Sequence, residues 1–399
     1  MKHAEKRKLA VLLLIGVLSL TTLLSGCGSD SGKAGGDTVK IGFITYLAGD
    51  QAYVGQAAKM ALEDYVDELN EKGGLLGKKV EVITYDYSKD PATESVNATN
   101  KLIQQDKVIA ILGPSGSQSA MPMIPLVEKA KVPVIATSAT NAAVTVDSKT
   151  DKVYPWMFRV CFIDEYQGKV LGSFAATDAN IKKAALLCGI GDPYAESLSA
   201  EFKGAFEENG GKVVAELSYQ LKDVEFRAQL TEAAEKGAEA IMVPATYYKD
   251  VVLMSQQAKD LGLKFKFLVG DGIYSEELLQ LAGSELEGSY MTSGVAEDDP
   301  VLKEYSKEFS KRHSGQSANV YVAYTLDAVM LLEHAINEAG SFDTEKIRDA
   351  LENAKDVKVF TEDSLTIDSG THNPYNKAVS ILEIKDSKYT LYKKYKPQE

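Results

Sequence analysis

Residues 108–141 read VIAILGPSGSQSAMPMIPLVEKAKVPVIATSATN, and the order of residue types in this stretch indicates the fold class. Two short apolar runs, VIAIL and VPVIA, have the length and the β-branched content of buried strands. The segment between them, residues 118–131, has the pattern of a helix. Apolar strands that alternate with helices are typical of parallel βαβ units with both faces of the sheet covered. The stretch therefore predicts an α/β fold.

The same alternation continues on both sides of this stretch. On the N-terminal side, Ala58, Leu62, Tyr65 and Leu69 recur with the spacing of one helical face, and Lys72-Gly73-Gly74 provides the end of that helix. The expected strands are 39–46, 78–87, 108–114, 131–138, 182–189, 212–220, 238–246 and 264–272. The expected helices between them include 91–105, 194–209, 225–236 and 247–262.

The pattern changes after residue 290. Helices at 300–313, 317–339 and 343–354 precede two β segments, LTIDSG (365–370) and residues 377–395, which an Asn-Pro turn at 372–375 separates. A chain of this length exceeds one compact core. We therefore expect two similar, doubly wound parallel-sheet lobes.

The N-terminus has the pattern of an export signal. A basic start, MKHAEKRK, precedes the apolar run LAVLLLIGVLSL, which ends in LSGC at Cys27. The run is too short for a confident membrane-spanning helix. LSGC resembles a bacterial lipobox, so residues 1–26 are expected to be a lipoprotein signal peptide. Cys27 would carry the lipid and residues 27–37 would form a tether, while ordinary cleavage with Cys27 as a bystander stays open.

The charge excludes one class of partner. The formal net charge of the whole chain is −13, and residues 1–26 contribute +3, so the chain from Cys27 onward is near −16. Such a protein repels the phosphates of nucleic acid. Of the remaining cysteines, Cys161 and Cys188 lie in apolar contexts, which favours buried free thiols over the disulfide that export would permit.

The loop 112–120, LGPSGSQSA, lacks the residues of a catalytic motif. It has no Lys at P-loop spacing and does not match G-x-S-x-G, and GIGDPY (189–194) lacks the third glycine of a dinucleotide fingerprint. The histidines after Cys27 are His313, His334 and His372, none beside an obvious orienting carboxylate motif. No Cys/His cluster has zinc spacing. We therefore expect no enzyme, no cofactor and no metal.

Polar loops after consecutive strands indicate binding instead. Ser117 follows one strand at the start of a helix, and Ser138, Ala139 and Thr140 follow the next. Such loops converge where open α/β sheets bind ligands, although Ser and Thr there also serve simply as helix caps.

Candidate residues also follow strands in the second series. Asp271, in VGDG, has no Lys or Arg nearby in sequence and can pair with a ligand ammonium, or cap the next helix. Tyr194 and Tyr247 from this half, and Tyr53 from the first, can supply ring walls and hydroxyls. Together with the serines they would form a clamp for a zwitterion.

Six segments in a characteristic order carry a family resemblance: IGFITYLAGDQAYVGQ, LNEKGGLLGKKVEV, the Asp-Pro of YSKDPATE, ILGPSGSQSA, VPVIATSATN and VGDGIYSE. In these, the chain resembles the lipoprotein form of the periplasmic-type (type I) solute-binding proteins of the branched-chain amino acid kind, which serve ABC transporters. The resemblance extends from Val39 to about Tyr395. It implies two lobes with three chain crossings: 38–159 with 290–365, and 160–289 with 366–397.

The resemblance also implies roles for individual residues. Ser117 and Thr140 would hold an amino acid carboxylate, and Ser138 and Thr140 its ammonium. Asp271 would be the counter-charge, where the best-known branched-chain binder has Glu. Tyr194 and Tyr247 would close over the ligand.

The expected protein is a lipid-anchored, extracytoplasmic monomer that captures a branched-chain or other aliphatic amino acid and delivers it to an ABC permease. A sensory binding protein and a binder of a non-amino-acid carboxylate are the alternatives.

Overall fold

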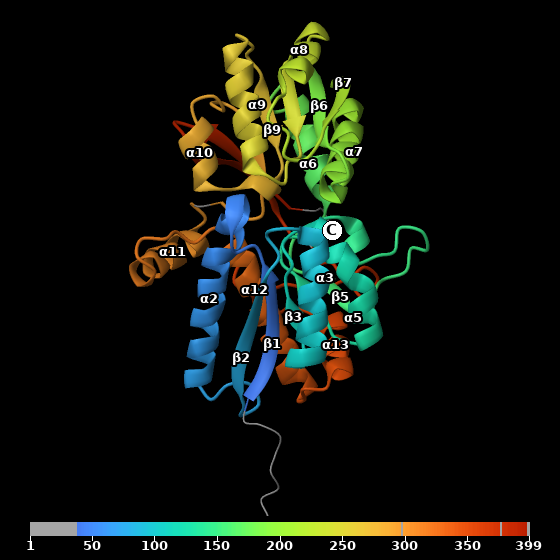
Figure 1. Cartoon of the computed structure of the whole chain (residues 1–399), viewed down its shortest axis with the longest axis vertical. Helices are drawn as coiled ribbons and strands as arrows, with labels where there is room; N and C mark the ends of the chain where they lie inside the picture. Colours follow the sequence, from blue (N-terminus) through green and yellow to red (C-terminus); the bar gives the residue numbers. More distant parts are fainter. Residues whose placement is uncertain (1–37, 297, 376, 397–399) are drawn as a thin grey trace, which may run out of the picture. The chain divides into compact units, whose positions relative to one another are not determined.

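The computed structural model describes residues 38–296, 298–375 and 377–396. The expected signal peptide, the lipid-carrying Cys27 and the tether all lie outside these residues. The described chain contains two sheets, with strand orders β2-β1-β3-β4-β5 and β12-β11-β10-β9-β8-β6-β7 (Figure 1). Strands and helices alternate along the sequence, which confirms the α/β fold class.

The first sheet is parallel throughout, because each connection between its strands crosses back to the same edge, through helices after β1, β2 and β3 and through the turn η4 and a loop after β4. Its strands are β1 (Thr38–Thr45), β2 (Lys79–Asp86), β3 (Ile111–Leu112), β4 (Val134–Ala136) and β5 (Met157–Arg159). Its helices are α2 (Ala52–Glu71), α3 (Pro91–Lys101), α4 (Ser117–Ala120), α5 (Ile124–Ala130), α11 (Pro300–Arg312), α12 (Val320–Ala339) and α13 (Thr344–Glu352). Short helical turns η1 (Gly49–Gln51), η2 (Leu102–Asp106), η3 (Met121–Met123) and η4 (Ala142–Val144) join them.

The second sheet is parallel through its first five strands and ends in an antiparallel pair. Its strands are β6 (Lys183–Gly189), β7 (Lys212–Tyr219), β8 (Ala240–Val243), β9 (Lys266–Val269), β10 (Tyr290–Ser293), β11 (Val379–Lys385) and β12 (Lys388–Tyr395). Its helices are α6 (Asp164–Ala176), α7 (Pro193–Glu208), α8 (Arg227–Glu235), α9 (Tyr248–Asp260), the turn η5 (Asp271–Ile273) and α10 (Glu276–Ala282).

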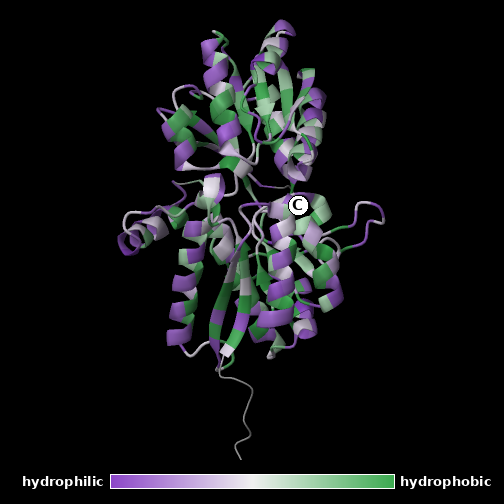
Figure 2. Ribbon diagram, in the orientation of Figure 1, coloured by the Kyte–Doolittle hydropathy of each residue, from purple (hydrophilic) through white to green (hydrophobic). Residues whose placement is uncertain are grey.

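Strand β6 shows why these apolar strands are covered on both faces. Ala184 and Leu186 belong to one buried cluster, with residues of α6 and α7, whereas Ala185 and Leu187 belong to another, with residues of α8 and α9. Successive side chains of a strand point to opposite faces, so a continuous apolar run requires helices on both sides. Figure 2 shows the same distribution, with hydrophobic strands and hydrophilic outer faces on the helices.

Several elements differ from the sequence prediction. LTIDSG forms only isolated bridges, Val357 with Leu365 and Ile367 with Pro374. Residues 377–395 form a hairpin rather than one segment, because residues 386 and 387 both adopt positive φ and turn the chain. Three elements were not predicted from the sequence: strands β5 and β10 and helix α6. Each of the two strands has only three or four residues.

Strand pairing also moves two of the expected lobe boundaries, although the division into lobes remains a prediction. β10 pairs with β9 and β11, so residues 290–293 lie in the second sheet rather than with the first lobe. His372 stacks on Phe158 with ring centroids 4.1 Å apart and holds the Met157 carbonyl, so the chain stays beside the first sheet beyond residue 366. It joins the second sheet at β11.

A buried ion pair holds this last return segment. Lys377 Nζ lies 2.7 Å from Asp327 Oδ2 on α12, and both side chains are buried. The Thr361 hydroxyl bonds to both residues.

Of the cysteines expected to be buried thiols, Cys161 is buried and Cys188 half-buried, and both are free. No helix in the described residues is long and apolar enough to span a membrane.

Candidate ligand-binding site

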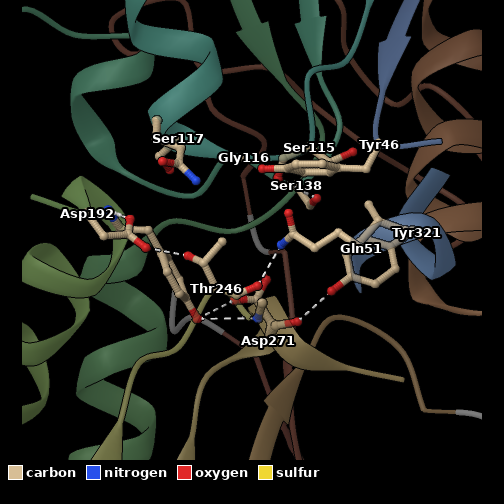
Figure 3. A pocket seen from close by; sticks show the side chains of 14 residues that line it. Tyr46, Gln51, Ser115, Gly116, Ser117, Ser138, Asp192, Thr246, Asp271 and Tyr321 are labelled. Atoms are coloured by element: carbon tan, nitrogen blue, oxygen red, sulfur yellow. Dashed lines mark hydrogen bonds between the residues drawn. The ribbon is translucent and has the colours of Figure 1, made fainter. Parts of the chain in front are cut away.

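A pocket lies where the carboxyl ends of strands from both sheets meet, with about 440 Å³ of space free of protein atoms, including its open mouth. Figure 3 shows Tyr46, Ser115 and Ser138 on one side of it and Thr246 and Asp271 on the other. The lining residues are Tyr46, Gln51, Val54, Ser115, Gly116, Ser117, Gln118, Ser138, Asp192, Tyr194, Thr246, Asp271, Gly272 and Tyr321.

Topology explains why these residues meet. In the first sheet β1 lies between β2 and β3, and in the second β6 lies between β7 and β8, so each sheet has a point where the strand order reverses. Loops leaving the carboxyl ends on either side of such a point diverge and leave a crevice. Most of the lining residues stand on loops that follow β1, β3, β4, β6, β8 and β9.

The loop after β3 is shaped by Gly113. This residue has a φ of +83°, and a Cβ there would lie 2.2 Å from the Ile44 carbonyl oxygen. Only glycine accommodates both the positive φ and the close approach to β1. The Ser115 N–H then donates to the Tyr87 hydroxyl at 2.9 Å, which holds the loop against the pocket.

The predicted serines have different uses in this loop cluster. The Ser117 hydroxyl oxygen accepts from the Asn141 N–H at 3.1 Å, so its own proton is free to be donated to a ligand. The Ser138 hydroxyl instead donates to the Ser115 carbonyl at 2.8 Å, so its proton is already in use. Ser117 is therefore the better hydroxyl donor of the two for an anionic group.

Asp271 is a buried carboxylate on the opposite wall. Its Oδ1 accepts from the Tyr194 hydroxyl at 3.1 Å, and its backbone N–H donates to Gln167 Oε1 at 3.2 Å. Burial raises the pKa of Asp271 to about 6, while Tyr194 and Gln167 lower it in part. The residue has no ion-pair partner among the described residues. A cationic ligand group would supply the missing charge.

A second carboxylate, Asp192, lies on the same wall. It caps α7 by accepting from the Tyr194 N–H at 3.1 Å, and its other oxygen accepts from the Thr246 hydroxyl. Burial raises the pKa of Asp192, and those hydrogen bonds lower it in part. The two carboxylates thus stand at the two ends of Tyr194, one at its backbone and one at its hydroxyl.

Hydrogen bonds cross the pocket between the two sheets. Gln51 Nε2 donates to the Thr246 carbonyl at 2.6 Å, and the Tyr321 hydroxyl donates to the Asp271 carbonyl at 3.0 Å. The Tyr53 hydroxyl donates to the Gly272 carbonyl at 3.1 Å. These contacts hold the wall that carries Asp271 against the wall that carries the serines.

The structure brings together four of the predicted ligand residues, Ser117, Ser138, Tyr194 and Asp271. The other four do not line the pocket. Tyr53 packs edge-on against Tyr248 and Tyr321, and Tyr247 lines an adjoining hollow. Ala139 and Thr140 are buried behind the lining. The Ala139 carbonyl accepts from Arg159, and the Thr140 carbonyl accepts from the Asp164 N–H.

Several lining residues have no counterpart in the sequence prediction. Tyr46 and Gln51 follow β1, and their place after a strand end is the signal that could have found them. Thr246 and Asp192 stood in segments already recognised as strand ends. Tyr321 is different, because it lies in the first turn of α12, where no local pattern marks a binding residue.

Within the part of the chain described, the site lacks basic side chains and a metal-binding cluster. No Lys, Arg or His lines the pocket, and no group of three or more His, Cys, Asp and Glu is placed to hold a metal ion there. Fold and site together define a two-sheet α/β binding protein with the type I periplasmic binding protein fold.

Comparisons with known proteins give the family. A family model described as periplasmic binding protein matches residues 38–388. A relative from Pseudomonas aeruginosa, named as a leucine-, isoleucine-, valine-, threonine- and alanine-binding protein, is 28% identical over 316 residues, 79% of this chain and 82% of the relative. The chain therefore belongs to the periplasmic binding protein family.

Solved structures agree with this assignment. The branched-chain amino acid transporter substrate-binding protein LivJ from Streptococcus pneumoniae, in complex with isoleucine, has a TM-score of 0.80 at 28% identity, covering 90% of this chain and all of LivJ. A solute-binding protein of an ABC transporter from R. palustris, in complex with 4-hydroxybenzoate, has a TM-score of 0.79 at 24% identity, covering 91% and 98% of the two chains. The second likeness shows the shared fold alone.

Proposed function

We propose that this protein captures an amino acid in the pocket between its two lobes and delivers it to an ABC permease. The observation that carries the proposal is Asp271, a residue that is 4% exposed and has no cation beside its carboxylate in the described chain. A buried carboxylate without a counter-charge is costly, and a ligand ammonium removes that cost.

The opposite wall suits the other end of an amino acid. The Ser117 hydroxyl proton is free, and the backbone of residues 115–118 borders the same space. The α-carboxylate would accept hydrogen bonds from this loop, with Ser117 as its main side-chain donor. The Ser138 carbonyl would share the ammonium with Asp271. Thr140, Ala139, Tyr53 and Tyr247 would act from behind the lining or from its rim.

Closure of the lobes is the mechanism we propose for capture. Each lobe contributes part of the contacts, so a ligand that touches both stabilises the closed state relative to an open one. The cross-pocket bonds of Gln51, Tyr53 and Tyr321 contribute to the same state. A micromolar Kd corresponds to about −8 kcal/mol. Several charge-assisted hydrogen bonds of about 1.5–3 kcal/mol each supply that after ordering costs.

The cellular setting follows from the N-terminal pattern and the family. The protein would be an exported monomer attached to the membrane through lipid on Cys27, and it would not be an enzyme. A sensory role without transport is the second candidate, and neighbouring genes for a permease pair and ATPases would separate the two. Branched-chain and other aliphatic amino acids, with threonine and alanine, are the first ligands to screen because the Pseudomonas aeruginosa relative is named for such ligands.

A thermal-shift screen tests the proposal. At a hundredfold excess over Kd, a bound amino acid should stabilise the protein by about 2–3 kcal/mol. The control ligands are the 2-oxo acid of each amino acid and 4-hydroxybenzoate, which carry a carboxylate but no ammonium. Stabilisation by 4-hydroxybenzoate and by no amino acid would refute the proposal.

A further inference from the structure

Aliphatic side chains are scarce among the residues that line the pocket. Of its lining residues, Val54 alone has an aliphatic side chain, and the others apart from two glycines carry hydroxyl, amide, carboxylate or phenol groups. An isobutyl or isopropyl group could pack on the tyrosine rings and on Val54, but it would leave polar groups of the wall without partners.

Three polar atoms at one end of the pocket have unused hydrogen-bonding capacity. The Tyr46 hydroxyl, Gln118 Nε2 and Ser119 Oγ are buried and make no hydrogen bond of normal geometry with any described residue. Tyr46 is 2% exposed and Ser119 fully buried, and Tyr46 and Gln118 line the pocket. Tyr46 lies beside Ser119 and Gln118, and Gln118 also lies beside Tyr247, so the three groups interact with one another. Because none of these contacts has normal hydrogen-bond geometry, Tyr46 and Gln118 keep capacity for an oxygen-bearing group in the pocket.

The three atoms belong to one cluster. Burial raises the pKa of Tyr46 well above its ordinary value, and the adjacent Ser119 and Gln118 side chains lower it in part. The phenol is therefore a neutral group that can donate a proton. Gln118 Nε2 is a donor only, so the cluster as a whole can serve a ligand acceptor oxygen.

The charges of the lining residues limit which ligand side chains the pocket can accept. Asp192 and Asp271 both line the pocket, and no basic side chain lines it in the described residues. A ligand with an acidic side chain would add a third carboxylate besides its own α-carboxylate. Both Asp192 oxygens already accept hydrogen bonds, from Tyr194 and Thr246, so this carboxylate is better satisfied within the wall than Asp271 and attracts a second ligand cation less.

We infer that the bound amino acid carries an uncharged, oxygen-bearing side chain, a hydroxyl or a carboxamide, which Tyr46 and Gln118 recognise. Figure 3 shows Tyr46 beside Ser115 and Gly116 on the wall opposite Asp271, so the side chain would extend along the serine loop. This inference rests on the proposed function, since it assumes an amino acid with its ammonium at Asp271.

Pairs of amino acids of nearly equal shape separate this inference from the proposed function. Isothermal titration would compare threonine with valine and asparagine with leucine. We expect the polar member of a pair to bind at least about tenfold more tightly, as one or two buried hydrogen bonds provide. Equal or tighter binding of valine and leucine, or tightest binding of lysine, would overturn the inference and leave the amino acid function standing. Absence of binding by every amino acid would overturn both.

Two variants test the residues named. Tyr46→Phe keeps the ring contact with Tyr87, whose centroid lies 4.3 Å away, and removes only the hydroxyl, while Gln118→Met keeps the length of the side chain. Each should lower the threonine-to-valine preference about three- to tenfold by weakening threonine, with valine affinity unchanged. Tyr85→Phe is the matched control, because its hydroxyl bonds to Asp106 outside the pocket and its removal should leave the preference unaltered. An unchanged preference in both pocket variants would overturn the assignment.

Discussion

The Tyr194 hydroxyl donates a 3.1 Å hydrogen bond to the Asp271 carboxylate, joining the first turn of α7 to the turn η5 that follows β9 across 77 positions of sequence. Desolvation raises the pKa of Tyr194 well above its ordinary value, so the phenol stays a neutral donor. The Tyr194 bond holds the carboxylate in place at the wall of the pocket. A ligand ammonium would meet an acceptor whose position is already set, which reduces the ordering cost of binding.

Asp271→Asn tests the charge at this position. The substitution keeps the shape and removes the counter-charge, so amino acid affinity should fall by about 1.5–3 kcal/mol. The matching 2-oxo acids lack the ammonium and should lose far less. Calorimetric titration of each pair measures the difference, and equal losses for both would mean that Asp271 does not meet the ammonium.

Tyr194→Phe tests the hydrogen bond itself. Its loss should weaken amino acid binding by about 0.5–1.5 kcal/mol. Because Tyr194 lowers the pKa of Asp271 in part, the variant should also move the acid limb of the binding curve to higher pH. Tyr219→Phe is the matched control, since that hydroxyl bonds to Asp250 at 3.0 Å and neither residue lines the pocket. A shift of equal size in the control would count against the role of Tyr194.

The pH dependence of binding and of stability should have opposite signs. Binding needs ionised Asp271, whose pKa is about 6, so affinity should fall as the pH drops below 6, by at most about tenfold per pH unit. Burial raises the pKa of Asp164 to about 8, above its unfolded value. The folded protein therefore takes up a proton that the unfolded chain does not, and ligand-free stability should rise as the pH falls from 8.5 to 6.5, by at most about 2 kcal/mol.

Asp164→Asn tests the predicted pH dependence of stability separately from that of binding. The variant should remove most of the rise between pH 8.5 and 6.5 in urea titrations. The pH range ends at 6.5 because burial lowers the pKa of His372. Below that pH the unfolded chain protonates this histidine before the folded protein does, which lowers stability and opposes the effect of Asp164. A wild-type protein that loses stability over this window would contradict the prediction.

The buried Lys377–Asp327 pair should be costly to break. Lys377→Met leaves the Asp327 carboxylate buried without its cation, which should lower the free energy of unfolding by about 3–5 kcal/mol. Adding Asp327→Asn should restore part of the loss. Lys131→Met removes the exposed pair with Glu345 and should cost less than about 1 kcal/mol, so similar losses for the two single variants would refute the argument.

Chain order explains why some of the predicted site residues line the pocket. Ser117, Ser138 and Asp271 stand in the segments that follow apolar strands, and a parallel sheet places all such segments at one edge, so local sequence was enough to place them there. Thr140 stands in an equally suggestive loop, but its side chain contacts Asp164 at the start of α6 and so partly lowers the pKa of that carboxyl. Thr140 therefore lies behind the lining. Two residues of one loop face opposite ways, and composition does not distinguish them.

The alternation of apolar strands and amphipathic helices in this sequence was sufficient for the α/β class, the two sheets and the edge at which the pocket lies, because these depend on periodicity and chain order. Tertiary structure alone decided that β10 pairs in the second sheet, that Tyr321 returns on α12 to meet Asp271, and that only one aliphatic side chain of the described residues lines the pocket. These features depend on which distant segments pack together, and burial and pairing energies across many residues determine that, not any local pattern.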